Sequence, residues 1–556
     1  MSRYAVLAWQ PLLRPPLPDE LIPMDSGALD IPLKALACRN QSTSVMALVI
    51  ADEPTECVKI NISDLASDRG RIPAEAVSVH LVGSVPTPEA GPICDPIYEV
   101  EEFGINKSAT LYLRINVPSD VKPGIYRGEM ALVVGSDDVA HSVLEVEVAN
   151  VELPNVHDWD FFLNVWMNPG AVARWYGLEL WSESHFCALR QYVADLAAHG
   201  QKTVVVPICY QPWGTQTRDP YPNIIRWTKR GDAFEFDFSN FDRYVRLHEE
   251  FGIDRAIHCY SIVQGPGESD KSVIEYEDAK TGERVLLETT VGDKQYVAAW
   301  SQFFKAFSHH LAEKGWLNKV YIGFDEKPDA VMEKLLAFVR DYAPGFKTSL
   351  AGNTREENYT ALDDLSLQVT FDDHGIAQTC PSERAALGVA QLLDPQNSCI
   401  LTRDCLKKTI TTYYVCCSPA FPNTFVHSPL VESRMLGWLA LQGGFDGFLR
   451  WSYNDWSDDP YRHPEFGSWP TGDTFFVYPG DRGPVSSLRW EQLREGIADY
   501  MLALIASANI RNSEEMVDFQ QAISLACRNP DGRYKSVGDI EIARRLLIPI
   551  AERSNI

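Results

Sequence analysis

Lys319-Val-Tyr-Ile-Gly-Phe-Asp-Glu-Lys-Pro328 is the stretch from which the fold can be worked out. Its apolar run, 320–324, contains β-branched and aromatic residues, which predicts a buried strand. Asp325 and Glu326 end the run, and Pro328 prevents further strand pairing. Residues 329–342 then carry apolar side chains on one helical face. Two carboxylates are therefore predicted at the carboxyl end of a buried strand, where α/β proteins assemble active sites.

Adjacent carboxylates suit the cleavage of a glycosidic bond, which needs a proton for the leaving group and negative charge at the oxocarbenium centre. Because neighbouring carboxylates resist being ionised together, one of them tends to keep its proton near neutral pH. A structural alternative is that Asp325 only caps the next helix and Glu326 lies on the rim. The surrounding sequence favours the catalytic interpretation.

From residue 156 the sequence alternates between predicted strands and helices. The predicted strands are Phe161–Trp166, Thr203–Ile208, Arg255–Ile262, Val320–Phe324, Lys347–Ala351, Leu365–Thr370, Thr411–Cys416 and Gly447–Tyr453. Helices are expected between several of them, for example at 184–199 and 296–314. Eight strands alternating with helices predict a (β/α)8 TIM-like barrel over residues 156–510, with the acid pair ending its fourth strand.

The barrel is predicted to lie between two further regions. Residues 1–155 contain short alternating segments separated by Pro and Gly, which predicts an N-terminal β-sandwich that packs against the barrel. Residues 511–556 are predicted to form a helical extension packed on the barrel, with helices near 513–527 and 537–551. The charges of these C-terminal helices are expected on solvated faces.

Polar and aromatic residues, Trp213 among them, also gather at the predicted carboxyl ends of other barrel strands. Their shared position predicts a wide polar and aromatic cleft. A Trp beside Asn and Asp in a loop is costly unless it covers something, which singles out Trp451 and Trp456. The candidate substrate-binding residues are Trp166, Gln216, His258, Tyr260, Asn353, Tyr414, Trp451, Tyr453, Asn454 and Trp456.

Composition limits the partners and cofactors. A formal net charge of −26 argues against nucleic acid or an anionic membrane as a partner. The sequence has no run long enough to span a membrane and no secretory signal. A cytoplasmic location is expected as written, or a secreted or periplasmic one if a leader was removed. The twelve cysteines form no CxxC pair or ligand-like cluster, so no metal or cofactor is expected. Cys416 and Cys417 are expected to be buried, reduced thiols. The sequence does not predict an oligomeric state.

Several motifs together resemble glycoside hydrolase family 123, the β-N-acetylgalactosaminidase family. They are Gly323-Phe-Asp-Glu-Lys-Pro328, Pro422-Asn-Thr-Phe425, Gly447-Phe-Leu-Arg-Trp-Ser-Tyr-Asn454, Gly472-Asp473, Tyr478-Pro-Gly480, Leu488-Arg489 and Leu493-Arg-Glu-Gly496, with Ala173-Arg-Trp-Tyr-Gly177, Trp181-Ser182 and Gln216-Thr217. The resemblance covers approximately residues 156–505, and the N-terminal sandwich fits the family's usual layout.

The resemblance implies a retaining, substrate-assisted hydrolysis of terminal β-linked N-acetylgalactosamine, or N-acetylhexosamine, from a glycan. The 2-acetamido oxygen of the sugar would attack the anomeric carbon and form an oxazolinium ion. Glu326 would then be the general acid/base, and Asp325 would orient the acetamido N–H and stabilise its positive charge. A tyrosine hydroxyl, from Tyr414 or Tyr453, would donate to the acetamido carbonyl. The sequence does not decide between galacto and gluco preference.

Two other functions stay open. One is a retaining glycosidase of other specificity, with Asp372, Asp373 or Asp455 as the enzyme nucleophile. The other is a non-catalytic carbohydrate-binding protein, which the presence of both Asp325 and Glu326 disfavours.

Overall fold

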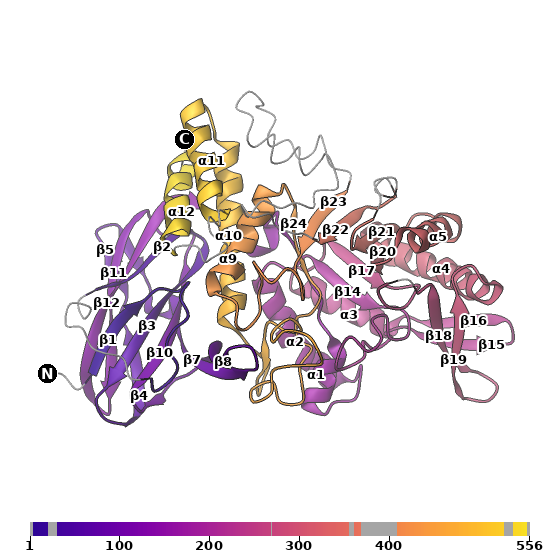
Figure 1. The fold of residues 1–556 in the computed structure, drawn as a ribbon, viewed down its shortest axis with the longest axis horizontal. Helices are drawn as coiled ribbons and strands as arrows, with labels where there is room; N and C mark the ends of the chain where they lie inside the picture. Colours follow the sequence, from indigo (N-terminus) through magenta and orange to yellow (C-terminus); the bar gives the residue numbers. More distant parts are fainter. Residues whose placement is uncertain are drawn as a thin grey trace.

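The computed structural model describes residues 4–20, 31–267, 269–354, 358, 361–368, 409–527 and 537–552. The molecule is elongated, with N-terminal sheets at one end, a barrel in the middle and a small sheet at the other end (Figure 1).

The N-terminal region consists of two sheets whose strands are mostly antiparallel. One sheet contains, in spatial order, β1 (Tyr4–Trp9), β3 (Gln41–Ala51), β10 (Ser108–Val117), β7 (Val77–Thr87) and β8 (Gly91–Glu99). The other contains β2 (Leu33–Arg39), β12 (Asp137–Glu152), β11 (Gly124–Val134), β4 (Thr55–Ile62) and β9 (Phe103–Ile105), with β5 (Leu65–Ser67) and β6 (Gly70–Ile72) beside them. Alternate residues, such as Val45 and Val49 on β3 and Leu132 on β11, enter one core shared by both sheets. This arrangement is consistent with the predicted β-sandwich.

Eight parallel strands form the barrel, in the spatial order β13-β24-β23-β22-β21-β20-β17-β14. Their bounds are β13 (Phe162–Val165), β14 (Thr203–Pro207), β17 (Ala256–Tyr260), β20 (Val320–Asp325), β21 (Lys347–Ala351), β22 (Asp364–Gln368), β23 (Ile410–Tyr414) and β24 (Gly447–Arg450). The barrel is nearly closed between β13 and β14, where the Lys202 N–H donates to the Leu163 carbonyl over 2.9 Å. All eight predicted strands are present, with bounds that differ by a few residues at most.

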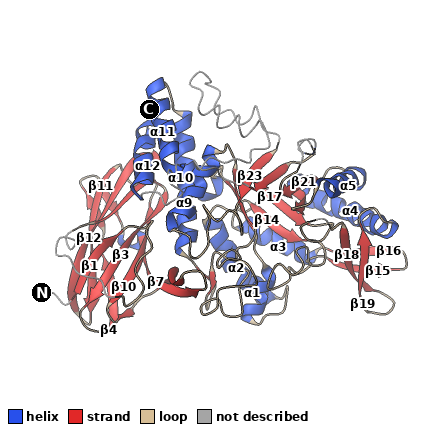
Figure 2. Ribbon diagram, viewed as in Figure 1, coloured by secondary structure: helices blue, strands red, loops and turns tan. Residues whose placement is uncertain are grey.

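Helices follow most of the barrel strands and cover its outside (Figure 2). They are α1 (Pro169–Tyr176), α2 (Glu183–Ala198), α3 (Ser239–Glu250), α4 (Lys294–Lys314), α5 (Asp329–Tyr342), α9 (Leu430–Gln442) and α10 (Leu488–Ala508). Short 3-10 turns lie at Ala74–Ala76, Val156–Asp158 and Leu317–Lys319, and β25 (Tyr478–Pro479) pairs with β26 (Pro484–Val485). In α5, Val331, Leu335 and Val339 are buried, as the apolar pattern predicts.

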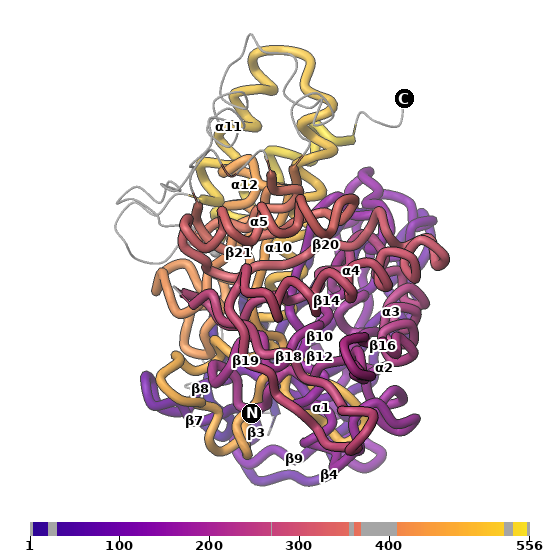
Figure 3. The backbone as a smooth tube through the Cα atoms, turned by 90° about the vertical axis from the view of Figure 1, so that its right-hand side faces the viewer, coloured from indigo at the N-terminus to yellow at the C-terminus, as the bar shows by residue number. Residues whose placement is uncertain are grey.

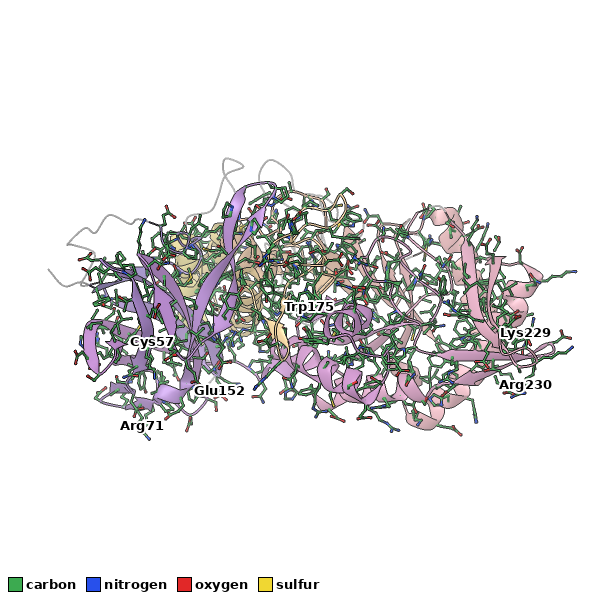
Figure 4. The ribbon with its side chains drawn as sticks, turned by 90° about the horizontal axis from the view of Figure 1, so that it is seen from below. Cys57, Arg71, Glu152, Trp175, Lys229 and Arg230 are labelled. Carbon is green, nitrogen blue, oxygen red and sulfur yellow. The ribbon has the colours of Figure 1, made fainter. Side chains whose placement is uncertain are left out.

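A four-stranded sheet that the sequence interpretation had not included is inserted in the loops after β14 and β17. Its strands are β15 (Arg226–Arg230), β16 (Ala233–Asp237), β18 (Lys271–Asp278) and β19 (Arg284–Thr290). Trp227 anchors the sheet by stacking on Phe303 of α4, with ring centroids 5.1 Å apart. Lys229 and Arg230 mark its outer tip, at the opposite end of the molecule from Cys57 on β4 (Figure 4).

The C-terminal helices α11 (Ser513–Cys527) and α12 (Val537–Ala551) agree with the predicted ranges, and α11 projects at the top of the molecule in Figure 3. Besides contacting α10, α12 packs on the N-terminal sheets. Arg544 donates to the Leu36 carbonyl over 2.7 Å, and Arg545 pairs with Glu147 at 2.9 Å. The extension therefore joins the sheets to the barrel. The boundaries predicted at residues 155 and 510 stay predictions.

The expectation of solvated charges is wrong for Arg544 of α12, which is buried, and α10 buries its charged residues as well. One face of α10 lies against α9, where Gly437 and Gly496 let the helices approach so closely that a Cβ on Gly437 would lie 2.1 Å from the Gly496 carbonyl oxygen. The charged residues of α10 are buried as ion pairs. Arg434 of α9 lies 2.8 Å from both Glu495 and Asp499, and Glu491 pairs with Arg494 of α10 itself at 2.8 Å and with Arg114 of β10 at 2.5 Å.

Candidate active site

The acid pair lies where β20 ends. Asp325 is the last residue of β20 and is in register with Ala351 of β21, whose carbonyl accepts the Glu326 N–H at 2.7 Å. Glu326 has a φ of 42°, a left-handed conformation that non-glycine residues rarely adopt. Gly352, at the end of β21, leaves room for it, because a Cβ there would lie 3.0 Å from the Glu326 Cα. The tight packing at Gly352 therefore fixes the position of the exposed Glu326.

Asp325 and Glu326 open into a cavity of about 440 Å³, a size typical of small-molecule sites. The lining residues come from the carboxyl ends of the barrel strands and the loops that follow them. They are Trp166, Gln216, Gly267, Asp325, Glu326, Lys327, Pro328, Ala351, Gly352, Asn353, Gln368, Tyr414, Cys416, Cys417, Leu449, Trp451 and Trp469. Asp325 and Glu326 supply the only carboxylates among these described lining residues.

The two carboxylates have different surroundings. Asp325 is half-buried, and its Oδ2 accepts the Trp213 indole N–H at 3.0 Å. Burial and, to a smaller extent, the negative charge of Glu326 together raise the pKa of Asp325 to about 8, against the opposing effect of the Trp213 hydrogen bond. The pair therefore holds one proton at neutral pH, as adjacent carboxylates are expected to do. Asp325 keeps that proton in the ligand-free protein.

Tyr414 contacts the second carboxylate. It is the last residue of β23, and its hydroxyl donates to Glu326 Oε1 over 2.7 Å. Burial and the nearby charge of Glu326 raise the pKa of Tyr414 above its ordinary value. The phenol is therefore protonated at every physiological pH and acts as a hydrogen-bond donor in the cavity.

Lys327 fixes a loop beside the acids. Its buried ammonium donates to the backbone carbonyls of Gln264 and Ser269, each over 2.8 Å. Burial lowers the pKa of Lys327 to about 8. Gly267, in the same loop, lines the cavity and donates its N–H to the Glu326 carbonyl at 2.9 Å. Lys327 thus positions the loop that holds the backbone of Glu326.

Aromatic rings form the apolar part of the site. Trp166 packs on Trp213 and Tyr260, with centroid distances of 4.9 and 4.7 Å. Trp451 and Trp469 meet edge to face at 5.3 Å and both line the cavity. Polar groups beside exposed ring faces are the combination that binds the polar edges and apolar faces of a sugar.

Five of the ten predicted binding residues line the cavity: Trp166, Gln216, Asn353, Tyr414 and Trp451. His258 and Tyr260 do not, although both point into the barrel from β17. His258 lies deeper, between Asn164 at 3.3 Å and Asp364 at 3.2 Å. Tyr260 is buried against Trp166 and supports the cavity wall from behind.

The other three predicted residues, in the loop after β24, are buried away from the cavity. The Tyr453 hydroxyl donates to Asp195 of α2 over 2.5 Å, so of the two candidate tyrosines Tyr414 is the one that lines the cavity. The Asn454 side chain bonds the backbone of Asn168 in both directions, at 2.7 and 3.0 Å. Trp456 donates to the Val477 carbonyl over 2.7 Å and packs on Tyr192, so it covers the barrel helices instead of a ligand.

Of the three residues proposed as an enzyme nucleophile, Asp455 lies in the described part of the chain, and it does not line the cavity. Asp455 is buried and accepts the Arg218 N–H at 2.9 Å, and Asp372 and Asp373 lie outside the described residues. Among the described ranges, no three His, Cys, Asp or Glu side chains are arranged to hold a metal ion, and no helix is long and apolar enough to cross a membrane.

Some cavity residues were not among the predicted ones: Gln368, Cys416, Cys417 and Trp469. Gln368 does carry a signal, because it lies at the end of a barrel strand. Trp469 has none, since it lies in an irregular stretch far beyond β24.

A parallel barrel with a carboxylate pair at the end of one strand, in an aromatic-lined cavity, defines a glycosidase-type enzyme. The catalytic-domain profile of glycoside hydrolase family 123 matches residues 166–506. The chain belongs to glycoside hydrolase family 123.

A solved structure of the same family shares the fold. A family 123 glycoside hydrolase from Clostridium perfringens, described for glycolipid glycan hydrolysis, superposes with a TM-score of 0.77 at 22% identity, over 99% of this chain and 97% of that one. A family 5 xyloglucanase from Bacteroides ovatus has a TM-score of 0.28 at 7% identity, over 84% of this chain and 98% of that one. That score is too low to relate the two folds. No curated protein matched this chain.

Proposed function

We propose that this family 123 enzyme removes terminal β-linked N-acetylgalactosamine, or N-acetylhexosamine, from glycans by substrate-assisted catalysis. The observation that carries the proposal is the composition of the cavity. Its described lining offers two adjacent carboxylates at one strand end and no third carboxylate on another side. Two neighbouring acids can supply a proton and stabilise a charge, and the nucleophile is then the acetamido oxygen of the sugar itself.

In the first step, Glu326 gives its proton to the leaving oxygen while the acetamido oxygen attacks the anomeric carbon. In the second step, Glu326 takes a proton from the water that opens the oxazolinium ring. Two successive displacements at one carbon retain its configuration. The exposed position of Glu326 in the cavity suits contact with both the leaving group and water.

Asp325 accepts the acetamido N–H and stabilises the positive charge that spreads onto this nitrogen. Burial disfavours the ionised form of Asp325. The positive charge that develops on the acetamido nitrogen in the transition state therefore stabilises the ionised carboxylate more than the neutral acetamido group of the bound substrate does. The proton that Asp325 holds in the ligand-free protein then resides on Glu326. Tyr414, which donates to Glu326 without substrate, donates to the acetamido carbonyl in the complex.

The proposed natural substrates are glycans that end in such a sugar. Glycolipid headgroups are one class, because glycolipid glycan hydrolysis is the reaction described for the Clostridium perfringens relative. The aromatic walls of the cavity, Trp451 and Trp469, would contact the apolar faces of the sugar rings.

The test is hydrolysis of three matched aryl β-glycosides: N-acetylgalactosaminide, N-acetylglucosaminide and galactoside. Activity on acetamido sugars alone is the expected result, and the more active of the two assigns galacto or gluco preference. A thiazoline analogue of the preferred sugar, which mimics the oxazolinium ring, should inhibit competitively. Comparable hydrolysis of the plain galactoside would refute substrate assistance, because that substrate has no internal nucleophile.

A further inference from the structure

Two neighbouring cysteines, Cys416 and Cys417, line the cavity although the mechanism uses neither. They directly follow β23, two and three residues after Tyr414, and their Sγ atoms are 3.9 Å apart. The expectation that both are buried is wrong, because Cys416 is half-buried and Cys417 is exposed.

The backbone next to the pair is firmly held. Asn423 donates its side-chain amide to the Cys416 carbonyl at 2.7 Å, and Arg450 donates to the Val415 carbonyl at 2.5 Å. Arg450 is itself paired with Asp473 at 2.7 Å. These contacts keep the two sulfur atoms at the rim of the cavity.

The two thiols differ in reactivity. A hydrogen bond from the Cys416 thiol lowers the pKa of Cys417 to about 7, against burial and the charges of Asp473 and Glu326. The same contact raises the pKa of Cys416. The thiolate is the form of cysteine that reacts with oxidants. Cys417 therefore attacks the oxidant first, and Cys416 reacts with the oxidised Cys417 in the second step.

The other described cysteines lack this combination. Cys38, Cys94, Cys209, Cys259 and Cys527 are buried, which keeps them from oxidants in solution. Cys57 and Cys187 are exposed, but neither has a second cysteine beside it in the sequence.

We propose that Cys416 and Cys417 form an oxidation site at the rim of the catalytic cavity, which reacts with a peroxide and closes to a disulfide. The Cys417 thiolate attacks one peroxide oxygen, the O–O bond breaks, and Cys417 becomes a sulfenic acid as hydroxide leaves. Cys416 then attacks the Cys417 sulfur and expels the sulfenic oxygen as water. In total, two thiols and one hydrogen peroxide give one disulfide and two waters, and the two electrons lost by sulfur reduce the peroxide.

Such a disulfide is readily reversed. Neighbouring Cα atoms lie about 3.8 Å apart, whereas disulfide-bonded residues usually have Cα atoms at least about 4.4 Å apart. Strained and exposed disulfides are the ones that reductants reopen. Because the sulfur atoms line the cavity beside Tyr414, closing the small ring changes the rim through which a substrate enters.

The experiment uses the full chain with Cys380, Cys399 and Cys405, which lie outside the described residues, replaced by Ser. The protein is treated with hydrogen peroxide and dimedone, which traps sulfenic acids, and its peptides are weighed. The peptide with Cys416 and Cys417 should lose the mass of two hydrogen atoms, carry no dimedone, and regain its mass with dithiothreitol. Cys57, distant on the N-terminal sheets (Figure 4), is the internal control and should carry dimedone.

Two variants separate the steps. In Cys416→Ser the sulfenic acid on Cys417 has no partner, and the Ser hydroxyl can still donate to the Cys417 sulfur, so dimedone should now label Cys417. Cys416→Ala, the second variant if Ser disturbs folding, lacks this donor, so dimedone should label Cys417 more slowly. In Cys417→Ser neither product should form. Dimedone on Cys417 of the protein with both thiols, or an unreacted pair while Cys57 is labelled, would overturn the proposal.

The mass readout holds whether or not the proposed function is right. An activity readout, which rests on that function, accompanies it. Peroxide should lower the rate of aryl N-acetyl-hexosaminide hydrolysis, dithiothreitol should restore it, and Cys417→Ser should resist the loss. A disulfide without any loss of rate would confine the proposal to the oxidation chemistry and overturn its effect on substrate entry.

Discussion

Replacing Asp325 with Asn should make the protein more stable and less active, with a stability gain that depends on pH. Burial raises the pKa of Asp325 from 3.8 to about 8, so the folded protein binds more protons here than the unfolded chain between these pH values. Stability therefore falls as the pH rises from about 4 to about 8. A rise of about four pKa units would correspond to about 6 kcal/mol. Because Asp325 is half-buried and faces a water-accessible cavity, we expect about 1–3 kcal/mol.

Asn keeps an oxygen that can accept the Trp213 indole N–H, and it carries no charge. The substitution therefore removes the free-energy cost of burying an ionised carboxylate without creating a cavity. Calorimetry should find a melting temperature about 1–3 °C above that of the unmodified protein at pH 8, and little difference at pH 4. Asp341→Asn, which removes an exposed carboxylate on α5, is the control and should show no such pH dependence. The rate should fall by about 10²–10⁴-fold. A less stable variant at pH 8, or a difference that does not change with pH, would refute the reasoning.

Three further substitutions test the remaining contacts. Glu326→Gln should lower hydrolysis of substrates with poor leaving groups by about 10²–10⁴-fold, and much less with a dinitrophenyl leaving group, which needs no protonation. Tyr414→Phe removes the donor to Glu326 and should lower kcat/KM by about 10–100-fold, the scale of one charged hydrogen bond. Gly352→Ala introduces both a strained φ and a contact with Glu326, and should lower the melting temperature together with kcat, at a cost of about 1–3 kcal/mol.

Matched variants isolate each effect. Tyr413→Phe loses a buried hydrogen bond to the Leu436 carbonyl, outside the cavity, and should reduce stability but not kcat. Gly345→Ala has the same kind of positive φ, 98°, with no atom near the new Cβ, so it separates backbone strain from contact with Glu326. An unchanged rate for Tyr414→Phe, or equal losses of kcat in the two glycine variants, would contradict the assigned contacts. Full activity of Glu326→Gln would exclude it as the acid.

The sequence predicts the barrel well because its strands are short apolar runs that end in chemically distinctive residues. It places Asp325 and Glu326 correctly for the same reason. The sequence does not predict how deep in the barrel an inward-facing side chain lies. The alternation along β17 turns both His258 and Tyr260 inward, but the two side chains lie in different layers of the barrel interior. In the loop after β24, Tyr453 and Trp456 have the composition of a binding loop, yet the chain turns their side chains towards α2.

The inserted sheet shows a signal that was available. In β15 and β16, Trp227, Phe234 and Phe236 alternate with charged residues on either side of Gly231, which has a positive φ. That is the pattern of a hairpin with one buried face. Trp469, in contrast, reaches the cavity through an irregular segment that no periodicity predicts.

The contacts between α10 and the N-terminal sheets determine how the chain can be divided. Leu430 and Leu488 pack on Met46 and Tyr112 of the sheets, and Arg114 lies 2.5 Å from the buried Glu491. A fragment that began at residue 156 would expose this apolar patch to water and leave Glu491 without Arg114. We therefore expect the N-terminal sheets and the barrel to melt in a single cooperative transition. The catalytic region that the sequence delimits is then not an independent folding unit.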